Sequence, residues 1–334
     1  MIRKFATPLF AAFITVLLTA GACHAAENYV AENNYKITVG TGVRVRAAPS
    51  TSATEVGKLT LGTDFASSQR TAESVKIGNQ SAYWYQVDAP LKGWIFGGFL
   101  RSFDPAQADN ARLTLIRDKI GAADKLYDGY DNKSPLSFSD AVETSQFAHT
   151  AAAASKDAEA RGELELAYWR AVQLSLFPIT SADSAKPPYA AWLKQLGDNA
   201  FHSEPSDSYL VKPENFWTLA DLHAKDAIGD AIAWQAANAF VGGECEGSIG
   251  CMSARSLMME GEYLKRFPHG KHAEDALKAA AATLDFIKQD WKNQPDEGKD
   301  VDLKAWQAIL APLTDSAATK AARKTLQDIQ ALNH

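Results

Sequence analysis

The first third of the chain alternates apolar and polar residues with the two-residue period of β-strands. Val43 and Val45 share one face, while polar side chains occupy the positions beside them. Short apolar runs bounded by Gly, Pro or Asn predict further strands at 56–59, 63–65, 75–77, 83–87 and 93–96. We expect residues 75–77 and 83–87 to form a hairpin around the Gly-Asn turn between them. The pattern predicts an all-β module over residues 36–103.

After Asp104 the apolar period changes to that of amphipathic helices, and no further strand is predicted. In the first helical segment Leu113, Ile116 and Ile120 recur at a spacing close to 3.6 residues. The expected helices are 107–126, 141–155, 157–177, 216–224, 229–240, 253–266, 273–292, 302–310 and 317–332. Because short turns join them, we expect an all-α bundle or solenoid over residues 104–334 and a multidomain β + α chain.

Residues 1–26 have the three parts of a secretory signal peptide. A short basic stretch is followed by the apolar run 9–18 and then by small residues up to Ala26. The sequence therefore predicts export to the periplasm. Cys23 lies in a context that loosely resembles a lipobox, so a lipid anchor at Cys23 is an alternative to the favoured soluble protein. No membrane-spanning segment is expected after the signal.

Charge differs between the two regions. Residues 36–101 hold eight Lys or Arg against four Asp or Glu, whereas the residues from Asp104 onward hold 24 against 34. An acidic surface repels phosphate backbones, so nucleic-acid binding by the large region is not expected.

Two cysteines are left if Cys23 leaves with the signal peptide. An even pair in an oxidising compartment predicts a disulfide between Cys245 and Cys251. The Gly-rich loop 242–247 carries Glu244 and Glu246 beside this pair. We consider both glutamates candidate contacts for a protein partner, with a plain stapled turn as the alternative.

The β module resembles the bacterial SH3 (SH3b) family along nearly its whole length. Residues 43–50 correspond to the family stretch N-V-R-S-G-P-S, and Gly57 and Gly62 to the pattern G-x-L-x-x-G. Residues 84–87 match W-x-x-V, and residues 93–100 match the closing G-W-V…Y-L. This resemblance implies an SH3-like β-barrel that recognises peptidoglycan or a peptide.

An aromatic groove is the ligand site that this resemblance implies. Its candidate residues are Tyr83, Trp84, Tyr85, Trp94 and Phe96, together with Arg44 and Arg46. Strand alternation places Trp84 on the face opposite Tyr83 and Tyr85, so part of the set is expected to fill the barrel. The sequence departs from the family at Arg44, where Asn is usual, and at Ala48, where Gly is usual. The stretch 67–82 is also longer than the family connection.

A weaker resemblance lies near residues 253–290. Residues 263–268, ending in Phe-Pro, and the alanines from Ala273 onward resemble the repeat junction of tetratricopeptide-like periplasmic proteins. Such repeats could extend over 213–334, but no second copy recurs at a 34-residue period. An ordinary helical hairpin therefore stays open as the alternative.

No catalytic, metal-binding or cofactor-binding motif is found. H-E-x-x-H is absent, and the spacing from Cys245 and Cys251 to His269 and His272 departs from zinc-finger spacing. The run Gly-Ser-Ile-Gly at 247–250 lacks the first Gly of a nucleophile elbow. Asp221, His223 and Asp226 are expected to be solvated charges at a helix end.

These observations predict a non-enzymatic cell-envelope protein. Its SH3b module would bind peptidoglycan or a peptide, and its helical region would bind a protein partner. Two alternatives are a periplasmic immunity or inhibitor protein against a secreted toxin and a cell-wall enzyme of an unrecognised kind.

Overall fold

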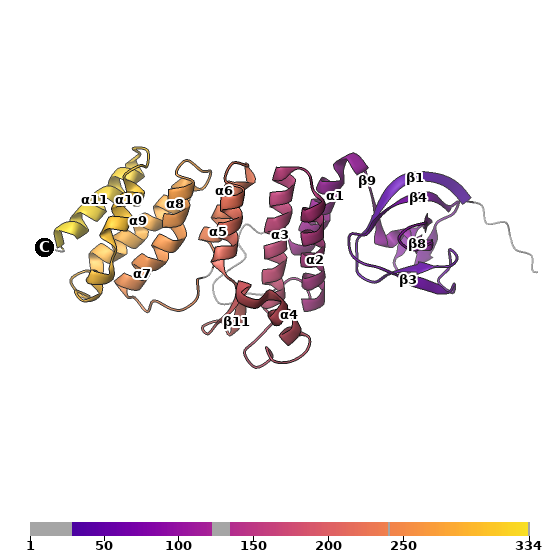
Figure 1. Cartoon of the computed structure of the whole chain (residues 1–334), viewed down its shortest axis with the longest axis horizontal. Coiled ribbons are helices and arrows are strands. Elements are labelled where there is room, and N and C mark those ends of the chain that lie inside the picture. The colour runs from indigo at the N-terminus through magenta and orange to yellow at the C-terminus, as the bar shows by residue number, and fades with distance from the viewer. Residues whose placement is uncertain (1–28, 122–133, 240, 333–334) are drawn as a thin grey trace, which may run out of the picture.

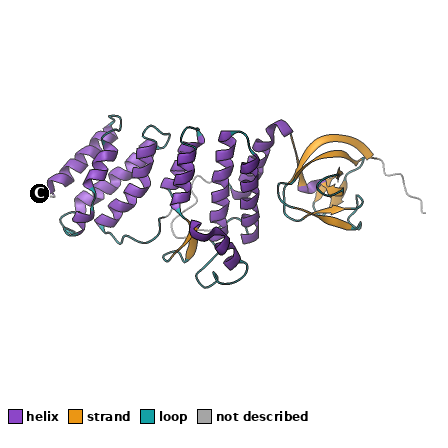
Figure 2. Cartoon of the chain, in the orientation of Figure 1, coloured by secondary structure: helices purple, strands orange, loops and turns teal. Residues whose placement is uncertain are grey.

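The computed structural model describes residues 29–121, 134–239 and 241–332. The expected signal peptide and Cys23 lie outside these residues. The β module lies at one end of an elongated molecule, and the helices follow in a row toward the C-terminus (Figure 1). Strands and helices are largely segregated along the molecule (Figure 2), so the multidomain β + α prediction is confirmed.

Seven antiparallel strands form the main sheet, in the order β3-β2-β8-β7-β4-β1-β9. A separate hairpin joins β5 to β6. The strands are β1 (Tyr29–Thr38), β2 (Val43–Arg46), β3 (Glu55–Leu59), β4 (Asp64–Thr71), β5 (Val75–Ile77), β6 (Gln80–Ala82), β7 (Trp84–Val87), β8 (Gly93–Phe96) and β9 (Leu100–Phe103). The expected SH3-like β region is present, but as one curved sheet rather than a closed barrel, because β3 and β9 are left as its open edges.

The core of this sheet follows the alternation of the sequence. Val43 and Val45 of β2 are buried beside Phe65 and Ile95, whereas Arg44 is exposed. The first strand begins at Tyr29, before the expected start of the module at Lys36. Its first half, Tyr-Val-Ala-Glu-Asn, is mostly exposed and does not alternate apolar with polar residues, so it lacks the pattern that would have revealed it.

The hairpin predicted between residues 75–77 and 83–87 forms with a different second strand. The strand β5 pairs with β6 at residues 80–82, whereas β7 pairs with β4 and β8 in the main sheet. The β5–β6 hairpin occupies the second half of the stretch 67–82, which is longer than in the SH3b family. The Gly-Asn turn and the strand 75–77 were placed correctly, but the second strand is 80–82 rather than 83–87.

The helical region contains eleven α-helices among the described residues. They are α1 (Ala108–Ile120), α2 (Phe138–Ala154), α3 (Ala158–Leu176), α4 (Tyr189–Leu196), α5 (Pro213–Leu222), α6 (Ile228–Ala237), α7 (Ile249–Ser256), α8 (Glu262–Arg266), α9 (Ala273–Asp290), α10 (Leu303–Leu310) and α11 (Ala317–Leu332). A π-helical turn, Leu257–Gly261, joins α7 to α8 in one continuous rod. None of the described helices is long and apolar enough to cross a membrane.

One prediction about this region is wrong, because strands do recur after Asp104. The strands β10 (Ala200–Ser203) and β11 (Ser208–Val211) form a small hairpin beside α4 and α5 (Figure 1). Gln173 of α3 anchors it, since its Oε1 accepts a 2.7 Å hydrogen bond from the backbone N–H of Val211. A four-residue strand held by a side chain from another element has too little periodicity to be predicted.

Neighbouring helices pack as antiparallel hairpins along the row, namely α2 with α3, α5 with α6, and the α7–α8 rod with α9. The last core joins α5–α11 around fully buried residues such as Tyr263, Leu284 and Trp306. Helix α8 ends before Pro268 and α9 begins at Ala273, so the turn expected there is present. This hairpin fits both a single helical hairpin and a repeat.

A small apolar cluster joins the β module to the helices. Ile37 and Leu61 are buried against Leu115 of α1, and Phe147 of α2 packs on them. The backbone N–H of Leu61 also donates a 2.9 Å hydrogen bond to Oε1 of Glu143. The two regions therefore share a packed junction rather than a bare linker.

Candidate functional site

A cavity of about 480 Å³ opens on the outer face of the β module. Its walls come from β2 with the turn before it, the β2–β3 turn, the β5–β6 hairpin, the start of β7, and the end of β8 with the 3-10 turn that follows it. The lining residues are Thr41, Gly42, Val43, Arg44, Arg46, Thr51, Ile77, Trp84, Phe96 and Phe99. The size suits a short peptide or a few chemical groups rather than a large ligand.

Aromatic side chains form the floor and rim of this cavity. Trp84 and Phe96 are buried and meet edge to face, with ring centroids 5.8 Å apart. Phe96 in turn meets Phe99, whose side chain is 46% exposed at the rim. Ile77 of the β5–β6 hairpin packs on the same aromatic cluster. The site therefore offers both a buried apolar floor and an exposed aromatic contact.

Two arginines supply the charge of the cavity. Strand β2 alternates, so Val43 and Val45 enter the core and Arg44 and Arg46 point outward. Arg46 is fixed, because its Nη1 donates a 2.7 Å hydrogen bond to the carbonyl of Ala53. The Nε of exposed Arg44 lies 3.2 Å from Oε2 of Glu55.

The remaining candidate residues do not line the cavity. Trp94 belongs to the same aromatic cluster as Trp84, but Tyr29 stacks on it with ring centroids 4.8 Å apart. Tyr83 and Tyr85 face another cation each: the Arg70 guanidinium lies 4.0 Å from the Tyr83 ring centroid, and the Lys36 ammonium lies 4.2 Å from that of Tyr85. Four of the seven candidates, Arg44, Arg46, Trp84 and Phe96, thus come together.

The two tyrosines belong to a charged cluster centred on Glu32. Its carboxylate accepts hydrogen bonds from Asn34 and Lys36, and Arg70 lies 3.4 Å away. Burial raises the pKa of Glu32, but these hydrogen bonds and cations outweigh burial and hold its pKa below the usual value. Burial also raises the pKa of Tyr85. The cluster ties β1 to β4 and gives Tyr83 and Tyr85 a structural role.

Sequence reasoning missed Ile77 and Phe99 as cavity residues. Ile77 lies in the stretch 67–82, whose extra length was the available signal. Phe99 directly follows the Gly97–Gly98 pair, in a short 3-10 turn that presents its ring beside Phe96. Ile77 carries no SH3b motif letter. Phe99 stands at the Tyr position of the closing G-W-V…Y-L motif, but only the folded sheet and the 3-10 turn bring its ring to the cavity.

A second cavity, of about 520 Å³, lies in the helical region between α5 and the α7–α8 rod. Trp217 of α5 lies on one side of it and Met258 of the π-helical turn on the other. Met258 is 52% exposed. The Arg266 guanidinium lies 4.8 Å from the Trp217 ring centroid and pairs with Asp221 and Glu262. The cavity therefore combines apolar side chains with charged ones, which include this paired set and also Lys212 and Glu214.

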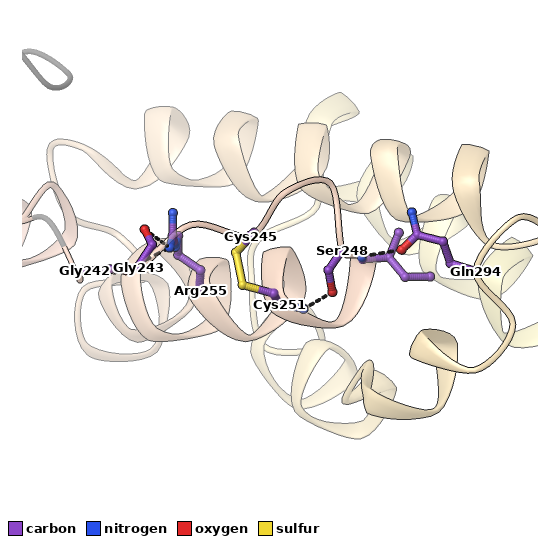
Figure 3. Close-up of a disulfide and its surroundings, with 8 residues drawn as sticks. Gly242, Gly243, Cys245, Ser248, Cys251, Arg255 and Gln294 are labelled. Atoms are coloured by element: carbon purple, nitrogen blue, oxygen red, sulfur yellow. Dashed lines mark hydrogen bonds between the residues drawn. A yellow bond between two sulfur atoms is a disulfide. The ribbon is translucent and has the colours of Figure 1, made fainter. Parts of the chain in front are cut away.

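The predicted disulfide between Cys245 and Cys251 is formed (Figure 3). It closes the loop before α7, and Arg255 holds the same loop by donating to the carbonyls of Gly242 and Gly243. Gln294 accepts from the N–H of Ile249 at the start of α7. Glu244 and Glu246 are exposed, so they are open to solvent as a partner contact would require.

Removing the disulfide with Cys245→Ala and Cys251→Ala is expected to lower the free energy of unfolding. The closed ring is short, and the chain-entropy estimate for it is roughly 2–2.5 kcal/mol. Urea unfolding with and without reductant measures the effect. The wild-type midpoint should fall on reduction and that of the double variant should stay constant. Equal midpoints for oxidised wild type and double variant would show that Arg255 and Gln294 suffice to hold the loop.

Asp221, His223 and Asp226 were expected to be solvated charges at a helix end, and for His223 this prediction is wrong. His223 is only 1% exposed, with its Nδ1 2.8 Å from Asp226 and its Nε2 2.8 Å from Glu165 of α3. Asp221 instead pairs with Arg266. The imidazole joins α3 to the α5–α6 turn through these two carboxylates. Among the described residues, no group of three or more His, Cys, Asp or Glu side chains is arranged to hold a metal ion.

Comparison with protein families identifies the β module. The family model described as bacterial SH3 domain matches residues 41–101, which include β2 to β8 and all seven candidate groove residues. Neither a curated protein nor a solved structure matches the chain. The family match does not reach residues 253–290, so the tetratricopeptide resemblance there stays a prediction.

Proposed function

Because residues 41–101 form a bacterial SH3 domain, we propose that the protein is a non-enzymatic binding protein of the bacterial cell envelope. Its SH3 cavity takes a short peptide of the cell wall, and the protein is exported to the periplasm by its signal peptide. The observation that carries the proposal is the cavity between Trp84, Phe96 and Phe99, which belongs to a module of a family that suggests peptidoglycan binding.

The module uses several features that suit an extended peptide. The buried Trp84 and Phe96 rings give an apolar floor, and the exposed Phe99 ring can cover a bound side chain. Polar Thr41 and Thr51 lie at the same cavity. An extended peptide presents alternate side chains to such a surface and keeps its backbone polar groups available for hydrogen bonds. Binding of this kind needs no chemical step, which agrees with the non-enzymatic proposal.

Replacing Phe99 by alanine is expected to weaken binding to purified peptidoglycan sacculi. Phe99 is an exposed aromatic ring at the rim of a small site, and losing its contact with a bound ligand is expected to cost about tenfold in affinity. Co-sedimentation of the full protein at increasing sacculus concentration measures the change. Because the module shares the Ile37–Leu61 junction with the helices, the full chain is used rather than an excised fragment.

Tyr35→Ala is the matched control for Phe99→Ala. Tyr35 is an equally exposed aromatic of the same module, but it meets Phe103 and does not line the cavity. Its removal should leave binding unchanged. Equal loss in both variants, or no wild-type binding at all, would contradict the proposed site. Release of soluble fragments from labelled sacculi by the pure protein would contradict the non-enzymatic part.

The helical region is proposed to bind a protein partner. The specific observation is the cavity between α5 and the α7–α8 rod, where Met258 and Trp217 present apolar surface next to paired charges. Flexible thioether side chains are frequent at such protein-binding surfaces. The stapled loop with Glu244 and Glu246 precedes the same rod and could extend this surface.

A further inference from the structure

The charged side chains that line the SH3 cavity all have the same sign. Its lining includes two cations, Arg44 and Arg46, and no aspartate or glutamate. The rest of the lining is apolar or neutral, and its aromatic rings are those of Trp84, Phe96 and Phe99. A ligand that fits both parts must combine a small apolar group with a negative charge a short distance away.

We propose that this cavity selects wall peptides by a free carboxylate, with Arg44 as the residue that determines this specificity. The inference rests on the proposed function and adds the chemical class of the ligand. Stem peptides of the wall supply such carboxylates next to small apolar side chains. The family usually has Asn at this position, so the preference belongs to this chain rather than to the fold.

Arg44 can exchange its present partner, Glu55, for a ligand. A guanidinium carries five N–H donors, and the contact with Glu55 at 3.2 Å uses the Nε side. The Arg44 and Glu55 side chains are both well exposed, so this ion pair is weak and is screened by salt. The outer N–H groups of Arg44 can then bind a carboxylate in a bidentate fashion.

Arg46 has a different part in the same site. Its hydrogen bond to the Ala53 carbonyl fixes the guanidinium and at the same time holds the β2–β3 turn that carries Thr51. Arg46 therefore supplies a fixed positive charge beside the cavity. It is not the residue to remove in a test, because its loss would also free the β2–β3 turn. Arg44 has no such backbone hydrogen bond among the described residues, so it can be changed without loosening the wall of the cavity.

Sacculi with blocked carboxylates test the inference. Wild-type protein is titrated against native sacculi and against sacculi whose carboxyl groups have been amidated. Amidation is expected to weaken binding about tenfold, which is the scale of one charge-assisted hydrogen-bonded pair. Arg44→Gln should bind native sacculi as weakly as wild type binds amidated sacculi, and amidation should change its binding little. Arg44→Lys should keep an intermediate affinity, since it keeps the charge but loses the bidentate geometry.

Lys92→Gln is the control for overall charge. Lys92 is an exposed cation of the β7–β8 loop and does not line the cavity. If Lys92→Gln weakens binding as much as Arg44→Gln, the effect is general attraction between a basic module and an acidic wall, and the inference is wrong. If wild type binds native and amidated sacculi equally, the inference is wrong while the proposed function stands. If it binds neither, the proposed function fails as well.

A competition experiment tests the source of the carboxylate. A wall stem tetrapeptide with free carboxyl groups is expected to displace the protein from sacculi, and its amidated form should need about tenfold higher concentration. A linear tetrapeptide of L-residues with the same net charge should compete poorly. If the linear peptide displaces the protein as well as the stem peptide does, the cavity reads protein carboxylates in general, and the assignment to the wall is overturned.

Discussion

Replacing Trp306 by alanine is expected to lower the free energy of unfolding of the C-terminal helices by about 3–5 kcal/mol. Trp306 of α10 is completely buried in the core that joins α5 to α11. Its indole N–H donates a 2.9 Å hydrogen bond to Oγ of Ser253 on α7, which is also buried. Alanine removes the packing of the ring, and it leaves the hydroxyl of Ser253 without this partner. Urea unfolding, followed by hydrogen exchange in α7, α9, α10 and α11, measures the loss.

Further variants separate the packing of the ring from its hydrogen bond. Trp306→Phe keeps an aromatic ring in the core but loses the N–H and part of the indole volume, so its cost should be smaller, about 1–3 kcal/mol. Adding Ser253→Ala to it removes the unpartnered hydroxyl and should recover part of that cost. Trp192, which bonds Ser175 in the neighbouring core, offers the matched comparison because its loss should open α4 first. Unchanged exchange in α7 after Trp306→Ala would refute the proposed link between α7 and α10.

The β module could be predicted in large part because its strands follow a simple rule. Val43 and Val45 enter the core and Arg44 does not, as a two-residue period requires. The same rule places Trp84 and Tyr85 on opposite faces of β7. Trp84 lines the cavity, whereas Tyr85 faces Lys36. Where apolar and polar residues do not alternate, as in the first half of β1, the strand was missed. Its pairing with β4 shows what the sequence did not reveal.

The candidate site could be predicted only in outline. Motif positions identified Arg44, Arg46, Trp84 and Phe96, because residues that build a family's surface recur at fixed places in its strands. Ile77 and Phe99 were not predicted as cavity residues, because their place at the cavity depends on how a hairpin and a short turn fold over the sheet. Such long-range placement is set by packing and has no local periodicity to reveal it.

His223 was misjudged for a related reason. Three ionisable residues near a helix end indicate a solvated surface when only the local sequence is considered. Its ring is buried because Glu165, more than fifty positions earlier in the chain, reaches its second nitrogen. A buried polar side chain needs partners for its polar atoms, and those partners come from tertiary structure. Helix positions were easier, because each amphipathic period is contained in its own segment.

The junction between the two regions is the last feature that the sequence did not reveal, and Gly62→Ala tests it. Gly62 was identified as an SH3b turn glycine, and its φ of +74° is indeed a conformation that favours glycine. A Cβ at this position would also lie 2.0 Å from Cε2 of Phe147 on α2. The expected loss is about 1–2 kcal/mol from the backbone and about 1–3 kcal/mol from overpacking. Urea unfolding of the full chain measures the total.

Gly78→Ala is the matched control, because Gly78 has a similar φ of +60° and open space where its Cβ would lie. It should show the backbone cost alone. Gly62→Ala should in addition speed hydrogen exchange at the junction, in β1 and in α1, because the collision separates Leu61 from Leu115. Combining Gly62→Ala with Phe147→Ala removes the colliding ring, so the two changes should cost less together than the sum of each alone. Additive costs, or equal effects of Gly62→Ala and Gly78→Ala, would mean that the β module and the helices are not held rigidly together at this contact.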